Sequence, residues 1–145
     1  MQIAAMSPAS IAHVAAVEAE LRQSNHQIGL KTQHFFHGGI YRRVVLLPEG
    51  KEMVGVLIKL PTTLIVIGDA FMWVEGGWRH VGNEVLTASA QRKQHFIANE
   101  DTEIHMLFPT QAKTVDEAER EFTDAFSDLL SRRIDAGEET IFTGE

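Results

Sequence analysis

Between Tyr41 and Phe108 the chain consists of short apolar runs that are separated by turn-forming residues at nearly even spacing. The runs are rich in Val, Ile, Leu, Phe and Thr, which fit a pleated, half-buried surface. The breaks between the runs are Pro48-Glu49-Gly50, Gly68-Asp69, Gly76-Gly77, Gly82-Asn83 and Asn99-Glu100-Asp101. This pattern predicts one antiparallel β unit over residues 41–108.

The predicted strands cover residues 41–47, 52–60, 64–74, 78–81, 84–89, 93–98 and 103–108. About seven short strands with tight turns favour a sandwich or a barrel, because closure of the sheet removes exposed edges. The run 64–74 is apolar at almost every position. It predicts either a central strand covered on both faces or a strand that bends at Gly68 and crosses the barrel.

One helix is predicted on each side of the β unit. Ser7-Pro8 supplies an N-cap and a proline at the first helical position, so we expect a helix over residues 8–22. Thr114-Val115-Asp116-Glu117 is a capping box and predicts a second helix over residues 115–133. Residues 23–33 are polar and suggest a connector or an irregular edge strand, and residues 134–145 suggest a loose tail.

Composition limits the classes of function. At 145 residues the chain is long enough for one core, so we expect a single domain over residues 1–145. A net charge of -7 argues against non-specific nucleic-acid binding, which rests on Lys and Arg. The absence of cysteine excludes disulfides, thiolate metal sites and a cysteine nucleophile. No apolar window approaches a membrane span and Met1–Met6 lacks a basic region, so we expect a cytoplasmic protein without a membrane partner.

The β unit resembles the cupin superfamily, and more closely the small cupin-like proteins of bacteriophage and proteobacterial genomes. The resemblance covers residues 33–110. It rests on Gly39-Ile40-Tyr41-Arg42-Arg43, Pro48-Glu49-Gly50, Gly55-Val56-Leu57-Ile58-Lys59, residues 64–68 and Ala88-Ser89-Ala90-Gln91-Arg92-Lys93. It implies a mainly β, cupin-like jelly-roll barrel with a helix at each end. Cupins usually hold a divalent metal with two histidines and a glutamate from a first motif and one histidine from a second.

The usual metal ligands of that family are absent here. No histidine lies between Gly38 and Arg79, and Pro61 stands where the resemblance places the glutamate. Lys93 stands at the histidine of the second motif, and a protonated lysine has no lone pair for a metal. We therefore expect no metal cofactor. A divalent ion stays an alternative if histidines elsewhere in the chain have taken over the site.

Basic residues near the expected ligand positions suggest that an anion takes the place of metal and substrate. The predicted ligand-binding residues are Tyr41, Arg43, Lys59, Lys93, His95 and His105. In the alternative interpretation Lys93 lies on the solvent face of its strand, since lysine is seldom buried. His95 shares the face of Lys93, and together with His105 it forms either a relocated metal or acid-base site or two separate hydrogen-bonded strand histidines.

Three functions follow from these patterns. The first is a non-enzymatic barrel that binds a small, anionic or nucleotide-like molecule, with no catalytic residue. The second is a metal-dependent isomerase or dioxygenase that uses His34, His37, His95 and His105. The third is a structural or protein-interaction module, including a phage protein that acts against host defence. We expect a homodimer, located in the host cytoplasm if a phage encodes it.

Overall fold

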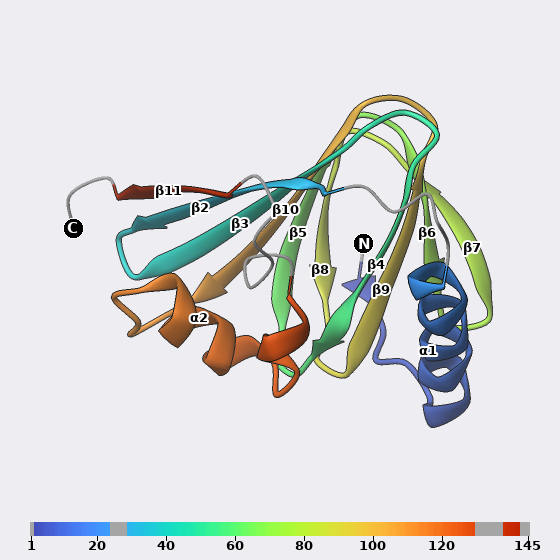
Figure 1. The fold of residues 1–145 in the computed structure, drawn as a ribbon, viewed down its shortest axis with the longest axis horizontal. Coiled ribbons are helices and arrows are strands. Elements are labelled where there is room, and N and C mark those ends of the chain that lie inside the picture. The colour runs from blue at the N-terminus through green and yellow to red at the C-terminus, as the bar shows by residue number, and fades with distance from the viewer. Residues whose placement is uncertain (1, 24–28, 130–137, 143–145) are drawn as a thin grey trace.

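The computed structural model describes residues 2–23, 29–129 and 138–142 (Figure 1). Among these residues, no helix combines the length and the apolar character that a membrane crossing requires. The elements in chain order are β1 (Gln2–Ile3), α1 (Pro8–Arg22), β2 (Lys31–His37), β3 (Ile40–Leu47), β4 (Glu52–Ile58), β5 (Thr62–Ile67), β6 (Ala70–Val74), β7 (Gly77–Val81), β8 (Glu84–Ala88), β9 (Arg92–Ala98), β10 (Thr102–Pro109), α2 (Val115–Phe122), the 3-10 turn η1 (Phe126–Asp128) and β11 (Glu138–Phe142).

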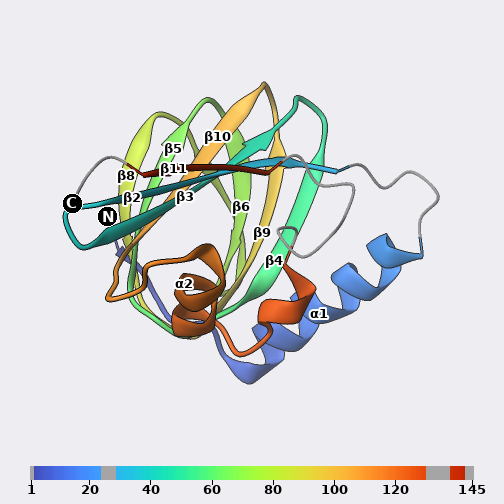
Figure 2. The ribbon, with the colours of Figure 1, turned by 60° about the vertical axis from the view of Figure 1, so that its left-hand side comes forward.

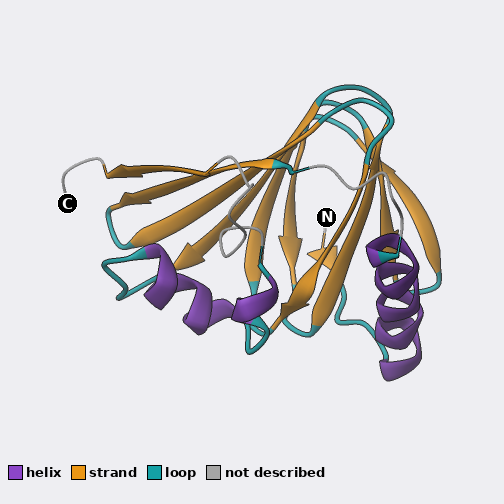
Figure 3. Ribbon diagram, viewed as in Figure 1, coloured by secondary structure: helices purple, strands orange, loops and turns teal. Residues whose placement is uncertain are grey.

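The strands form two sheets that face each other (Figures 1 and 3). The larger sheet has the order β1-β8-β5-β10-β3-β2-β11, and the smaller has the order β4-β9-β6-β7. The core lies between them and is made of inward-facing apolar side chains such as Leu64, Val66, Met72, Phe96 and Ile104. The predicted mainly β barrel with a helix on each side is therefore confirmed.

The long apolar run at 64–74 bends at Gly68, which is the second of the two predicted alternatives. β5 ends at Ile67 in the larger sheet and β6 begins at Ala70 in the smaller one. Gly68 has φ of +131°, a conformation that side chains disfavour. Its N–H donates to the side chain of Asn83 at 3.0 Å, which fixes the corner where the chain changes sheet.

Helix α1 has the predicted boundaries and covers the outer face of the smaller sheet (Figure 2). The Ser7 hydroxyl accepts a hydrogen bond from the N–H of Ser10 at 3.1 Å, as its N-cap position predicts. Trp73 of β6 donates from its indole to Ser10 at 3.2 Å, and its ring stacks on His13 at 4.5 Å. These contacts hold the start of α1 against the sheet.

Helix α2 ends eleven residues earlier than the predicted residue 133, at Phe122. Its N-terminus is as expected, because Thr114 accepts from the N–H of Glu117 at 3.2 Å. Its end is set by β4 instead of by the helix's own pattern. The Thr123 hydroxyl donates to the carbonyl of Leu57 at 2.7 Å, and the N–H of Lys59 donates to the carbonyl of Phe122 at 2.9 Å. The apolar stripe then continues into η1, and residues 130–133 lie outside the described ranges.

Two strands, β1 and β11, were not predicted from the sequence, and a third, β2, was given only as one of two alternatives. β2 begins at Lys31, inside the segment predicted as a polar connector or irregular edge strand, and pairs antiparallel with β3. β11 lies inside the predicted loose tail, where Glu138–Phe142 pair in parallel with β2. β1 pairs in parallel with β8. β1 and β11 gain their backbone partners from strands that are distant in sequence, so local composition gives little sign of them, whereas β2 pairs with the next strand through the turn at Gly38-Gly39.

Candidate functional site

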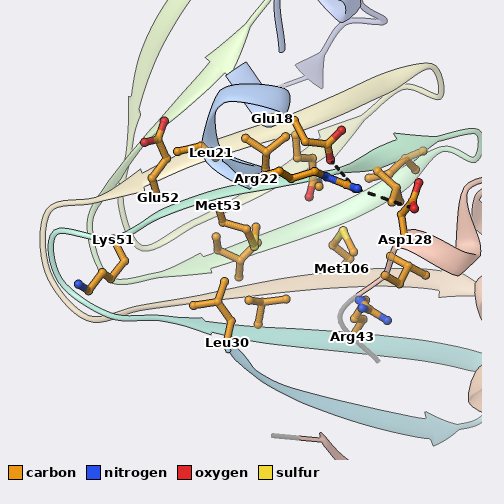
Figure 4. A pocket seen from close by; sticks show the side chains of 18 of the residues that line it. Glu18, Leu21, Arg22, Leu30, Arg43, Lys51, Glu52, Met53, Met106 and Asp128 are labelled. Atoms are coloured by element: carbon orange, nitrogen blue, oxygen red, sulfur yellow. Dashed lines mark ion pairs between the residues drawn. The ribbon is translucent and has the colours of Figure 1, made fainter. Parts of the chain in front are cut away.

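A cavity of about 260 Å³ lies between the two sheets, beside β4 (Figure 4). Its walls come from β4 and β9 of the smaller sheet and from β3 and β10 of the larger one. The last turns of α1, the end of α2 and η1 complete it. Segments from both ends of the chain therefore meet at one site.

Most of the cavity wall is apolar. The apolar side chains that line it are Leu21, Leu30, Val45, Met53, Val54, Val56, Ile58, Ile104, Met106, Phe122 and Leu129. Phe122 stacks on Phe108, with ring centroids 4.8 Å apart, and so presents a fixed aromatic face. Met53 and Met106 have flexible thioether side chains that adapt to the shape of a guest. The wall is suited to the apolar part of a small molecule.

Arg43 is the buried charged residue of the wall. Its Nη1 donates to the Glu119 carboxylate at 2.7 Å and to the Tyr41 hydroxyl at 3.2 Å. Burial alone lowers the pKa of the Arg43 guanidinium, but the Tyr41 oxygen and the Glu119 carboxylate outweigh it and hold that pKa above its ordinary value. Arg43 is therefore charged, and Glu119 already balances its charge.

Arg22 spans the mouth of the cavity (Figure 4). It lies 3.7 Å from Glu18 on α1 and 3.9 Å from Asp128 in η1. Its side chain is 46% exposed, and ion pairs of this kind contribute only about 0–1 kcal/mol. These two ion pairs therefore add little to the stability of this part of the cavity wall.

The anion hypothesis expected Lys93 to point into the barrel, but it does not. Its Nζ pairs with Glu18 of α1 at 3.1 Å, on the outer face of the smaller sheet. It is nevertheless buried, at 8% exposure, so it is not on a solvent face either. The reason is the register: Arg92 is the partner of Ile58, which lines the cavity, and Lys93 is the partner of Leu57, which does not. The inward position at this point of β9 is therefore Arg92.

His95 and His105 lie on different sheets and do not form a joint site. His95 forms a hydrogen bond with the Glu52 carboxylate, and its ring packs edge-on against Trp78 at 4.7 Å. His105 contacts Glu103 of its own strand at 2.9 Å. Each is thus a hydrogen-bonded strand histidine, the second of the two alternatives given for this pair.

Of the six predicted ligand-binding residues, only Arg43 lines the cavity. Tyr41 is buried next to it and forms a 2.7 Å hydrogen bond with Nδ1 of His34, so it supports the wall from behind. Lys59 is 37% exposed and pairs with Asp124 at 2.7 Å, outside the barrel. His37 is exposed at the end of β2. The histidines of the enzyme alternative therefore do not converge.

No protein-family model and no curated protein matches the sequence. Solved structures do match the fold. A protein of Photorhabdus luminescens, plu4264, is 13% identical over 69% of this chain and 91% of its own, with a TM-score of 0.50. Salicylate 1,2-dioxygenase of Pseudoaminobacter salicylatoxidans is 10% identical over 70% of this chain and 30% of its own, also with a TM-score of 0.50. A cupin 2 conserved barrel domain protein of Salinispora arenicola is 12% identical over 72% of this chain and 84% of its own, with a TM-score of 0.48.

The chain has a mainly β, cupin-like barrel fold. At these identities the likeness concerns the fold alone, because proteins of one fold carry out many unrelated functions. The cupin barrel explains why the cavity lies between the sheets. It does not say what the cavity holds.

The residues of this cupin barrel do not fit a resident metal. Among the residues that the structure describes, no three or more His, Asp or Glu side chains are close enough together to share an ion. A protein site for zinc or iron needs about three such donors with an open position for substrate. The cavity wall is mostly apolar, and its acidic residues Glu18, Glu52 and Asp128 come from three different elements and form no such group.

Sequence reasoning missed two polar residues of the site, Glu119 and Gln94. Glu119 alternates with Glu117 and Glu121 in the sequence, a pattern typical of a solvent-exposed helix face, but it is fully buried against Arg43. Gln94 lines the cavity from β9. Its neighbours Arg92, Lys93 and His95 are polar too, so no apolar and polar alternation marks which side faces inward.

Proposed function

We propose that this cupin barrel binds a small, mainly apolar molecule in the cavity beside β4 and acts without catalysis, as a carrier or sensor. The observation that carries the proposal is the apolar wall, built from both sheets, both helices and η1 around about 260 Å³. Ligand pockets commonly enclose about 300–1,000 Å³, so this cavity suits a guest smaller than a nucleotide. Among the ligand classes that the sequence suggests, a small molecule is thus favoured over a nucleotide.

Three finer expectations stay predictions. The bacteriophage origin and the homodimer rest on the cupin resemblance, and the cytoplasmic location rests on the composition of the sequence. None of them is needed for binding in the cavity, because every wall of the cavity comes from one chain.

The binding proposal predicts that 1-octanol binds saturably, with one molecule per chain, and that Gly55→Leu weakens this binding at least tenfold. Gly55 lines the cavity, and a Cβ at this position makes ordinary contacts, the nearest at 3.6 Å from Gln94. The leucine side chain is therefore tolerated by the backbone and occupies space that the octyl chain needs. Isothermal titration calorimetry measures both affinities.

Val85→Leu is the matched control, because it adds apolar volume at a position that is 62% exposed and remote from the cavity. We expect it to leave octanol binding unchanged within twofold. Failure of octanol to bind the unmodified protein, or equal binding to Gly55→Leu, contradicts the proposal.

A further inference from the structure

Arg92 is a buried cation without a counter-charge. It is 1% exposed, and its Nε donates to the carbonyl of Ser89 at 2.5 Å. Both of its terminal nitrogens, Nη1 and Nη2, are buried and have no hydrogen-bond partner in the described part of the chain. Arg43, the other buried arginine of the barrel, differs because Glu119 balances its charge.

Arg92 lies on the inner face of β9. It is the register partner of Ile58, and it alternates along the strand with Gln94 and Phe96. Ile58 and Gln94 line the cavity, and Phe96 belongs to the core. The Arg92 side chain therefore leaves β9 on the face that carries two residues of the cavity wall, one across the sheet and one along the strand, and Arg92 lies just behind the residues that line the cavity.

Gln94 adds a second unused donor at this place. Its Nε2 is buried and, within the described residues, has no hydrogen-bond partner. Guanidinium and amide N–H groups are donors only, so the group that satisfies them must be an acceptor. Glu119, which is fully buried, already binds Arg43, and the acidic side chains that line the cavity, Glu18, Glu52 and Asp128, contact other partners. The acceptor is thus expected from outside the chain.

The charge of Arg92 persists at neutral pH. Burial lowers the pKa of its guanidinium to about 10, which leaves the group protonated at pH 7. A buried charge without a partner is strongly unfavourable, whereas an arginine paired with a carboxylate gains two parallel hydrogen bonds. A bound anion would therefore remove an unfavourable feature of the free protein.

We propose that Arg92 and Gln94 form a carboxylate-binding subsite beside the cavity, so that the ligand of this barrel is a small apolar monocarboxylic acid. The proposal rests on the proposed function, because the apolar part of the acid occupies the cavity described above. The carboxylate accepts hydrogen bonds from the guanidinium and the Gln94 amide, and the hydrocarbon part contacts Ile58 and the methionines. The planar fork of arginine matches a carboxylate better than a point charge does.

The test compares octanoate with 1-octanol, which share the hydrocarbon chain and differ in the head group. Calorimetry at pH 7 on the full chain is expected to show octanoate binding at least tenfold more tightly than octanol. In Arg92→Met this preference is expected to fall below twofold, while octanol binding stays within twofold of the unmodified protein. Arg42→Met is the control for net charge, because Arg42 lies over the Phe35 ring at 4.1 Å and away from the cavity; it should keep the preference.

The outcomes separate this proposal from the binding proposal. If neither compound binds, the proposed function fails, and the subsite fails with it. If octanol binds but octanoate is not preferred, or if Arg92→Met keeps the preference, the subsite is overturned and the cavity stands.

Folding gives a second readout. Without ligand, Arg92→Met should unfold at a higher urea concentration, since it removes an unpaired buried charge. A lower midpoint shows that Arg92 is satisfied in the free protein, and this also overturns the subsite.

Discussion

Replacing Arg43 by methionine is expected to lower the free energy of unfolding by about 3–5 kcal/mol, because it leaves the carboxylate of Glu119 buried without its partner. Arg43 is 3% exposed and Glu119 is fully buried, and their atoms lie 2.7 Å apart. The pair joins α2 to β3 from the inside of the barrel. Urea denaturation at pH 7 measures the loss.

Two variants show whether burial is the cause. Arg120→Met breaks a pair of similar length, 2.9 Å to Asp116, whose side chains are about half exposed. It is expected to cost less than about 1 kcal/mol. The double variant Arg43→Met with Glu119→Leu removes both charges and should recover most of the loss, since apolar replacements of buried pairs are often neutral. A loss from Arg43→Met no larger than that from Arg120→Met contradicts this account.

The sequence was a good guide wherever local chemistry determines structure. Turn residues at even spacing marked most strands of the barrel, because Gly, Asn and Asp allow the backbone conformations that tight turns need. The cap formed by Ser7 and Pro8 located α1, and Thr114 located the start of α2. In each case the residues that decide the structure are neighbours in the chain.

The secondary structure was predicted less well where contacts between segments distant in the sequence determine where an element forms or ends. α2 ends at Phe122 because Thr123 and Lys59 connect it to β4, although the apolar stripe alone continues further. β11 exists because β2 offers a free edge. Such hydrogen bonds join segments far apart in the sequence, and no local pattern encodes them.

The residues of the candidate site were also predicted poorly, because the sequence does not show which face of β9 each side chain occupies. The anion hypothesis selected Lys93 from motif spacing, but Phe96 faces the core and β9 alternates regularly, so Arg92 and Gln94 share its inner face and Lys93 lies on the outer one. A shift of one residue moves a side chain to the opposite face of a strand. The first four residues of β9 are all polar and all buried, because α1 covers their outer face. The sequence thus contained the basic residue of interest but not the face on which it lies.

Gly68→Ala is expected to lower the free energy of unfolding by about 3 kcal/mol or more, as the sum of two effects. A side chain at φ of +131° is strained by about 1–3 kcal/mol. The added Cβ would also lie 2.7 Å from Oγ1 of Thr102, 2.8 Å from the carbonyl oxygen of Asp101 and 2.9 Å from Cα of Thr102. Two of these three atoms belong to the backbone, so relief requires β10 to move, and overpacking of this kind costs about 1–3 kcal/mol.

Gly38→Ala separates strain from the collision. Gly38 also has a positive φ, +57°, but an added Cβ there meets nothing within 4 Å, so about 1–2 kcal/mol is expected. Equal losses for the two variants in urea denaturation would show that the corner at Gly68 is not tightly packed.

The corner also affects the cavity, because Asp101 accepts from the N–H of Glu49 at 2.9 Å, next to Gly50 on the cavity wall. A displaced Asp101 moves this wall, so Gly68→Ala should weaken octanol binding as well, whereas Gly38→Ala should leave it unchanged.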